Sequence, residues 1–330
     1  MSKRILVYIP CHSDIEQAIS QARSLRINFT NLANHENFDS WELVLVLAIN
    51  DYKMNVTQKS IAHELFDEII DFDSVFLFDA NICEGFLYAL KSKPNIFWIL
   101  SANDSLNPQA LKCIIEQISK YPIFDLIVAN KSQSYDKFTE FNETRLFKGD
   151  HHFGLISGVI YNFERVGKYF NSAPFFVWTG WGHLSVIYNA IKSKKALEII
   201  SIPESNLFSQ EIKNNLINQH HYSHSYFGSL IIQELMQKDT RSKKKFIRRF
   251  ILKNFHLHAY FKRVDKSSYD FNNIINKDNY LNFNIEIAES IIKSKTPFFY
   301  LIYLVLKKIR FDVVMKYKLV ELARSILKAR

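Results

Sequence analysis

Three apolar stretches of the chain each end in side chains that could do polar chemistry. The first is followed by Pro10-Cys11-His12-Ser13-Asp14, the second by Asn50-Asp51 and the third by Ser101-Ala102-Asn103-Asp104. In an open parallel sheet the carboxyl ends of the strands share one edge, and ligands bind there. A cluster of acid and amide groups suits a hard divalent cation, Mg²⁺ or Mn²⁺. Such an ion would bridge the oxygens of a diphosphate, so this edge is a candidate nucleotide site.

The elements that would position these groups alternate along the chain. Strands alternating with helices predict right-handed βαβ units and an α/β fold with a mostly parallel central sheet. Strands are expected at Ile5–Ile9, Glu42–Ile49, Asn95–Leu100, Leu126–Ala129 and Gly154–Tyr161, with short strand-like runs at Glu68–Asp73, Val75–Phe78 and Leu197–Pro203. Helices are expected at Asp14–Asn28, Thr57–Phe66, Asn81–Leu90, Pro108–Lys120 and Ser185–Lys192.

The composition excludes several classes of protein. With 330 residues, 48% of them hydrophobic, the chain can bury a sizeable core and is not disordered. It has only 8 glycines, and they form neither G-x-G-x-x-G nor a P-loop. A nucleotide would therefore be held without a glycine-rich phosphate loop.

Cysteine usage and hydropathy point to a reducing compartment. Cys11, Cys83 and Cys113 are far apart and suggest no disulfide framework. The opening apolar run is too short for a signal peptide, and the longest apolar stretch, Pro297–Leu306, is too short to span a bilayer. We therefore expect a cytoplasmic protein without a transmembrane helix.

Positive charge is concentrated in the last third of the chain. The net charge is +9 overall, yet residues 238–330 carry +14 and residues 1–237 carry −5. The basic residues alternate with apolar ones near helical spacing, as in helices that lie in the headgroup layer of an anionic membrane. Ordinary packing of these apolar stripes is the alternative, and no motif supports nucleic acid as a partner. The shift in composition predicts a catalytic domain over 1–237 and a basic helical region over 238–330.

At this point the sequence resembles a known family over roughly residues 3–200. It is similar to glycosyltransferases of the A fold, close to family 2 and to bacterial enzymes of the abequosyltransferase type. The resemblance rests on the opening strand with Pro10 and on the segments NICEGFLYAL, WILSANDSLNPQAL, GLISGVIYN and WTGWGHLSVIYNAI, in that order and spacing. It implies a Rossmann-like fold and a nucleotide-sugar donor.

The resemblance also implies a set of donor contacts. These are Pro10, His12, Asp14, Asp51, Asn81, Gly85, Ser101, Asn103 and Asp104. The family's metal motif is Asp-x-Asp, whereas this chain has Ser101, Asn103 and Asp104, so a single carboxylate remains. Asp104 with Asn103 is the candidate ligand pair for Mn²⁺ or Mg²⁺, bound more weakly than in the family, or not required. Alternatively, Asp104 only caps the helix that starts near Pro108.

Inverting transfer needs a base that takes the proton of the acceptor hydroxyl. Family members often have a Glu-Asp pair at the start of the later helix, where this chain has Gly182-His183. His183 is the candidate base because its ordinary pKa is near neutral; a core or capping histidine is the alternative. Asp150, beside His151 and His152, is held in reserve.

The acceptor would meet a second group of residues. Trp178 and Trp181 could stack on a sugar ring or could simply pack in the core, and Gly158 lies in the strand that the resemblance places near the acceptor. A third histidine group, His220, His221 and His224, has metal-like spacing but fits a polar helix face better.

The resemblance implies transfer of a sugar to a lipid-linked bacterial surface glycan, such as O-antigen, lipopolysaccharide or capsule. The expected place is the inner face of the cytoplasmic membrane, with the protein bound peripherally. A nucleotidyltransferase would need a Gly-, Arg- and Lys-bearing loop after the first strand, and PCHSDIEQA lacks it. A non-catalytic relative that binds sugar nucleotides or membranes as an assembly partner is the remaining alternative.

Overall fold

The computed structural model describes residues 2–11, 15–33, 38, 40–50, 52–72, 78–130, 135–142, 153, 156–179 and 182–209, with 290, 291, 293, 294 and 301. The chain divides into two compact units: Met1–Val177 with Trp181–Asn215, and Trp178–Gly180 with Leu216–Arg330. The units change over at Asn215, whereas the composition predicts a boundary after residue 237. Most of the second unit, including the apolar stripes of the basic region, lies outside the described residues.

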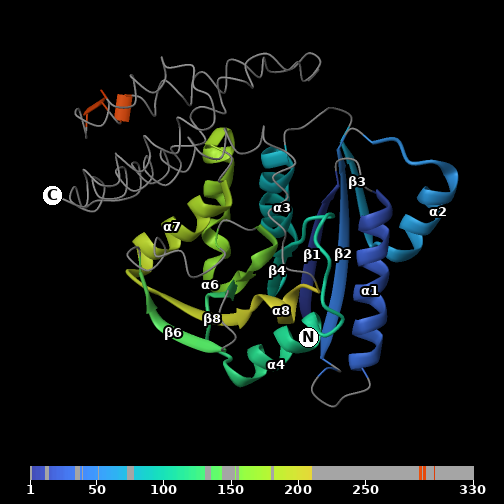
Figure 1. The fold of residues 1–330 in the computed structure, drawn as a ribbon, viewed down its shortest axis with the longest axis horizontal. Coiled ribbons are helices and arrows are strands. Elements are labelled where there is room, and N and C mark those ends of the chain that lie inside the picture. Colours follow the sequence, from blue (N-terminus) through green and yellow to red (C-terminus); the bar gives the residue numbers. More distant parts are fainter. Residues whose placement is uncertain are drawn as a thin grey trace, which may run out of the picture. The chain divides into compact units, whose positions relative to one another are not determined.

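The first unit is built on an eight-stranded sheet with the order β3-β2-β1-β4-β7-β5-β8-β6 (Figure 1). Its strands are β1 (Lys3–Cys11), β2 (Trp41–Asn50), β3 (Glu68–Phe72), β4 (Ile96–Ile99), β5 (Leu126–Asn130), β6 (Asp136–Phe141), β7 (Val159–Asn162) and β8 (Leu197–Pro203). All of them run in one direction except β7 and β6, which are antiparallel to their neighbours. The expected α/β fold with a largely parallel sheet is confirmed.

The antiparallel strand β7 lies between β4 and β5 and joins the two halves of the sheet. The apolar run expected as a strand over Gly154–Tyr161 is a strand only from Val159, and the turn before it is the 3-10 helix η1 (Ile156–Gly158). The turn and the strand are both buried, so the whole run is apolar. Periodicity alone therefore does not show where the turn ends and the strand begins.

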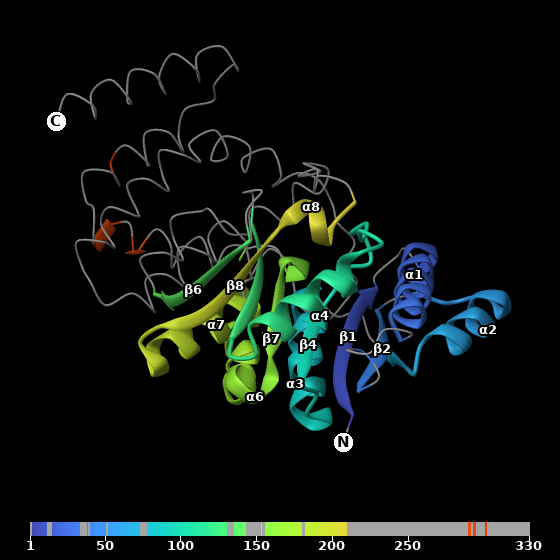
Figure 2. The same ribbon diagram turned by 90° about the horizontal axis from the view of Figure 1, so that it is seen from below.

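Helices cover both faces of the sheet. They are α1 (Ile15–Ala33), α2 (Val56–Leu65), α3 (Phe78–Ser92), α4 (Ala110–Lys120), α6 (Phe163–Val166), α7 (Gly182–Lys194) and α8 (Glu204–Leu207), with the 3-10 helix η2 (Gly167–Thr179). In Figures 1 and 2, α1, α4 and α8 lie on one face, and α3, α6 and α7 on the other. The side chains of α4 show why it forms there, because its apolar residues recur at helical spacing and are buried.

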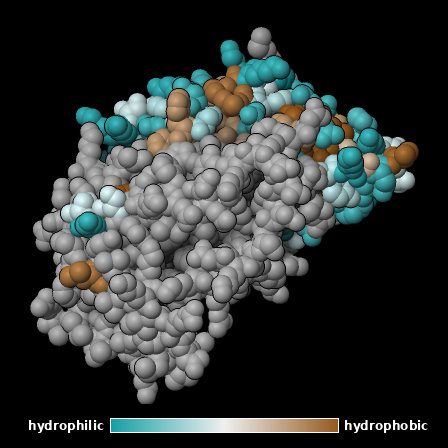
Figure 3. Space-filling view, turned by 90° about the horizontal axis from the view of Figure 1, so that it is seen from above, coloured by the Kyte–Doolittle hydropathy of each residue, from teal (hydrophilic) through white to brown (hydrophobic). Residues whose placement is uncertain are grey.

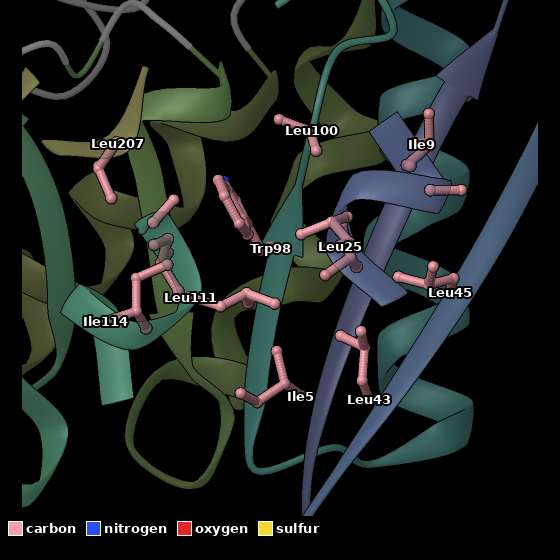
Figure 4. Packing of buried hydrophobic residues seen from close by; sticks show 14 of the residues in the cluster. Ile5, Ile9, Leu25, Leu43, Leu45, Trp98, Leu100, Leu111, Ile114 and Leu207 are labelled. Carbon is pink, nitrogen blue, oxygen red and sulfur yellow. The ribbon is translucent and has the colours of Figure 1, made fainter. Parts of the chain in front are cut away.

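Side chains alternate across β1 and so supply both cores. Ile5, Val7 and Ile9 join the cluster under α1 and α4, in which Trp98 and Leu111 also lie (Figure 4). On the other face, ring contacts join α3, the sheet and η2. Their centroids are 4.9 Å apart for Phe86 and Phe170, 5.5 Å for Phe86 and Phe97, and 5.4 Å for Phe86 and Tyr161.

A buried ion network closes the amino ends of β5 and β8, opposite the candidate site. The carboxylate of Asp125, only 1% exposed, accepts from Arg165 Nε at 2.7 Å and from the backbone N–H of Glu198 at 2.9 Å, and also contacts Lys194 Nζ. These bonds compensate the cost of burying the charge. The network is therefore a structural feature of this edge.

The described helices include none that is long and apolar enough to cross a membrane. Large apolar side chains that reach the surface, such as Ile27, Val56, Ile123 and Phe175, come from separate elements. The coloured surface in Figure 3 accordingly mixes hydrophilic and hydrophobic residues. Apolar residues scattered in this way are normal on a folded domain.

Candidate functional site

The carboxyl ends of the first three strong strands meet at one edge of the sheet, as the sequence predicts. β1 lies between β2 and β4, with Cys11 beside Ile49 and Tyr8 beside Ile99. Buried polar side chains follow this edge on both halves of the sheet, among them Asn50 and Asn130. The strand order therefore gathers the candidate donor residues into one region.

The loop Ser101–Asp104 leaves β4 at this edge as a tight turn. The N–H of Asp104 donates to the carbonyl oxygen of Ser101 at 3.2 Å, and the N–H of Asn103 donates to Ser101 Oγ at 3.3 Å. We call these four residues the donor loop, after the donor contacts that the sequence resemblance implies for them. Asn103 is exposed, whereas Asp104 is partly covered.

Two side chains from distant elements hold the donor loop. Gln21 of α1, 7% exposed, donates from Nε2 to the carbonyl oxygens of Ser101, at 2.9 Å, and Asp104. Ser157 of η1 accepts the N–H of Ser101 at 2.8 Å, and its hydroxyl bonds to the carboxyl group of Asp104. The carbonyl oxygen of Ser157 is itself fixed by Trp98 Nε1 at 2.7 Å. The loop is thus shaped by contacts made outside it.

The segment after β8 closes the far side of the same region. Leu106 and Phe208 form an antiparallel bridge, and the N–H of Ser209 donates to the carbonyl oxygen of Ser105 at 2.9 Å. Asn107 donates from Nδ2 to the carbonyl oxygen of Ser205 at 2.8 Å, and its Oδ1 accepts the N–H of Gln109 at the start of α4. The chain after β8 is therefore attached to the residues that follow the donor loop.

The carboxyl group of Asp104 points into the protein. One oxygen, Oδ2, is buried and has no hydrogen-bond partner among the described residues. Burial raises the pKa of Asp104 above its ordinary value; the hydrogen bond from Ser157 opposes this, and the charge of Glu204 adds to it. The environment therefore favours the neutral acid more than water does.

A divalent cation does not fit these residues as they are placed. Mg²⁺ and Mn²⁺ need several hard oxygen ligands and usually keep bound waters. No three His, Cys, Asp or Glu side chains come together in the described part of the chain. The expected ligand pair supplies one carboxylate, which is turned inward, and one exposed amide.

Asn81 and Gly85 lie in α3, where they pack against β1. Asn81 accepts from the Tyr8 hydroxyl at 2.8 Å and donates to the carbonyl oxygen of Ala48 at 3.2 Å. A Cβ atom on Gly85 would lie 2.8 Å from the Tyr8 ring, so glycine lets the helix approach the strand. The contacts seen for both residues are therefore with the protein. Pro10 is likewise buried in β1, beside Ala48 of β2.

His183 lies in the first turn of α7 and is only 2% exposed. Its Nε2 is 3.2 Å from the carbonyl oxygen of Phe153, which can only accept, so the neutral ring carries its proton on Nε2. Burial lowers the pKa of His183 to about 4. The ring is therefore neutral near pH 7.

His183 thus contacts a residue that lies close in the sequence to the other candidate base. Phe153 directly follows the segment that contains Asp150, His151 and His152, which lie outside the described residues. Gly158, the expected acceptor contact, is buried in η1 next to Ser157.

His12, Asp14, Asp51, Trp181, the side chain of Trp178 and the group His220, His221 and His224 lie outside the described residues.

Sequence reasoning missed Gln21 and Ser157, although each left a signal. Gln21 is a polar residue beside the apolar stripe Ile15, Ala18, Ala22 and Leu25, and Ser157 is a hydroxyl inside an apolar run. A polar side chain in an apolar pattern usually has a buried partner. The partner in both cases is the donor loop, which periodicity does not reveal.

No protein-family model and no curated protein sequence matches this chain. Among solved structures, residues 1–349 of S. aureus TarS match with a TM-score of 0.50 and 10% identity, covering 99% of this chain and 92% of that one. A longer TarS structure matches with a TM-score of 0.52 and 12% identity, covering 96% of this chain and 55% of that one. TarS 1–349 has also been crystallised with UDP and with UDP-GlcNAc.

A mannosyltransferase from Pyrobaculum calidifontis, solved with GDP-Man and Mn²⁺, matches with a TM-score of 0.46 and 11% identity, over 93% of this chain and 87% of that one. That score is too low to support an argument about this chain. With the strand order and the loop after β4, the matches to TarS define the class of fold: the chain has the glycosyltransferase A fold.

Proposed function

We propose that the protein transfers a sugar from a nucleotide-sugar donor to a glycan acceptor. The observation that carries this proposal is the donor loop: a tight turn at the carboxyl end of β4, held by α1 and η1 in a glycosyltransferase A fold. TarS, which shares this fold, has been crystallised with UDP-GlcNAc. Ligands of open parallel sheets bind at this edge.

In the proposed inverting reaction, the acceptor hydroxyl attacks the anomeric carbon on the side opposite the diphosphate. The new C–O bond forms as the bond to the diphosphate breaks, and a base takes the hydroxyl proton. His183 is the proposed base, with Asp150 as the alternative. The His183 ring is neutral near pH 7, but a pKa of about 4 makes it a weaker proton acceptor than an ordinary histidine.

The proposed acceptor is a lipid-linked bacterial surface glycan, met at the inner face of the cytoplasmic membrane. The support is the basic, apolar-striped sequence of residues 238–330. Replacing Lys243, Lys244 and Lys245 by Glu in the full chain should weaken sedimentation with anionic liposomes. Unchanged sedimentation would remove the membrane from the proposal and leave sugar transfer standing.

The first test of the proposal is a thermal-shift panel of UDP, GDP, CMP and dTDP, each with Mn²⁺ and with EDTA. A ligand that binds only the folded state raises the melting temperature. A shift with one nucleotide identifies the donor base, and the matching sugar nucleotide is then assayed for hydrolysis and transfer. No shift with any nucleotide would refute donor binding.

A non-catalytic relative is the second candidate, favoured by the inward carboxyl group of Asp104. It predicts nucleotide binding in the same panel with neither transfer nor hydrolysis of the sugar nucleotide. Turnover of the donor decides between the two.

A further inference from the structure

We propose that Asp104 anchors the donor loop from inside the protein and does not hold a cation, with Ser157 as the positioning residue that fixes it. The inference rests on the proposed function only in that the loop meets a donor nucleotide. It departs from the expected role of Asp104 and Asn103 as ligands of Mn²⁺ or Mg²⁺.

Ser157 contacts both ends of the donor loop. Its single hydroxyl group accepts the N–H of Ser101, at 2.8 Å, and bonds to the carboxyl group of Asp104. It therefore connects the first and last residues of the donor loop. Ser157 is 1% exposed and its carbonyl oxygen accepts from Trp98 Nε1, so the residue that carries the hydroxyl is held in place from both sides of the chain.

The second oxygen of the Asp104 carboxyl group is not exposed to solvent. Asp104 Oδ2 is buried. A divalent ion that used this buried oxygen would have to lose most of its water, which such ions do reluctantly. The amide of Gln21 holds two loop carbonyl oxygens through Nε2. These contacts fix the shape of the loop.

One side chain of the donor loop faces solvent. Asn103 is the exposed residue of the loop, and it carries a neutral amide. An amide recognises a sugar hydroxyl or a phosphate oxygen by hydrogen bonds. We therefore expect the donor to meet Asn103 and the loop backbone, and its affinity to be insensitive to divalent cations.

The test measures the dissociation constant of the nucleotide found in the panel, with Mn²⁺ and with EDTA, in the full-length protein. The dissociation constants of wild type with Mn²⁺ and with EDTA should agree within about two-fold. Asp104→Asn, whose side chain can still accept from Ser157, should give the same values as wild type. Asp104→Ala and Ser157→Ala should each weaken binding roughly ten-fold, because a buried hydrogen bond that shapes the loop is lost. Rescue by the asparagine variant is not expected of a metal ligand.

Ser92→Ala is the matched control. Its hydroxyl also bonds to a backbone carbonyl oxygen, that of Tyr88 at 3.0 Å, but in the last turn of α3, away from the donor loop. It should leave nucleotide affinity unchanged. Two results would overturn the proposal: tightening by Mn²⁺ of more than about ten-fold that Asp104→Asn abolishes, or normal affinity in Ser157→Ala.

If wild type binds no nucleotide at all, the proposed function fails. The anchoring role of Asp104 and Ser157 is then tested by amide hydrogen exchange without ligand. Because the N–H of Ser101 is bonded to Ser157, its exchange should speed up in Ser157→Ala and Asp104→Ala and stay slow in Asp104→Asn and Ser92→Ala. Equal exchange in all four variants would overturn the anchor as well.

Discussion

The replacement of Gly85 by Ala tests the packing of α3 on β1. The added Cβ would lie 2.8 Å from Cδ1 and 3.0 Å from Cε1 of Tyr8, whose ring is fully buried and whose hydroxyl is bonded to Asn81. Overpacking of this kind costs about 1–3 kcal/mol, and a displaced ring would also lose a hydrogen bond of about 1 kcal/mol. Alanine returns about 1 kcal/mol in helix propensity. The expected net loss is about 2 kcal/mol.

A loss of that size should lower the melting temperature by about 4–8 °C for a folded unit of this length. The assay is thermal and urea unfolding of the full chain. Repeating Gly85→Ala in a Tyr8→Leu background provides the control, because without the ring the methyl group has room and the substitution should be neutral or stabilising. If Gly85→Ala leaves the stability of the otherwise wild-type protein unchanged, the packing argument is refuted. Unchanged nucleotide affinity below the melting temperature would assign Gly85 to packing, and a selective loss of affinity would restore it as a donor contact.

Two further predictions concern buried ionisable groups. The pKa of His183 is lowered to about 4 when folded, against about 6.5 when unfolded, so the unfolded chain binds the extra proton first and stability falls by about 3 kcal/mol as pH drops from 6.5 to 4. Urea unfolding across this range should show a shallower fall in His183→Gln, and parallel curves for the two proteins would contradict the burial argument. Asp125→Asn should cost about 2–3 kcal/mol, because it removes the buried charge that Arg165 and Lys194 share. Glu116→Gln, in the exposed pair with Lys112, is the control and should cost less than about 0.5 kcal/mol, and an equal cost for both would mean that burial adds nothing.

The sequence was informative about the fold where apolar runs were long. Ile5–Ile9, Glu42–Ile49 and Leu126–Ala129 fall inside β1, β2 and β5, and the helices expected between them are present. These runs are buried on both faces and are easy to recognise. The sequence did not predict β6, whose residues Asp136–Phe141 are largely polar, or the place of β7, because strand order depends on contacts between distant residues.

The candidate site was only partly readable for the same reason. The carboxyl ends of β2 and β4 fall within one residue of their expected positions, whereas β1 continues through Pro10 and Cys11. The inward direction of Asp104 could not be read from the sequence, because it depends on Ser157, which lies 53 positions later in the chain. The donor contacts expected of Asn81 and Gly85 stay predictions; within the protein these two residues pack against Tyr8 and Ala48.

The attachment of Ser105 and Asn107 to the segment after β8 has a consequence for the order of synthesis. Asn107 leaves the ribosome 98 residues before Ser205, whose carbonyl oxygen it will bind. Until that segment emerges, the sheet strands β1, β2 and β4 can pair, while one side of the loop region lacks its partner. Contacts of such long range are formed late in folding. A nascent or prematurely terminated chain that ends before Ser205 therefore has its strands but lacks the contacts that hold Ser105 and Asn107 next to the donor loop, and we expect it to bind the proposed nucleotide poorly.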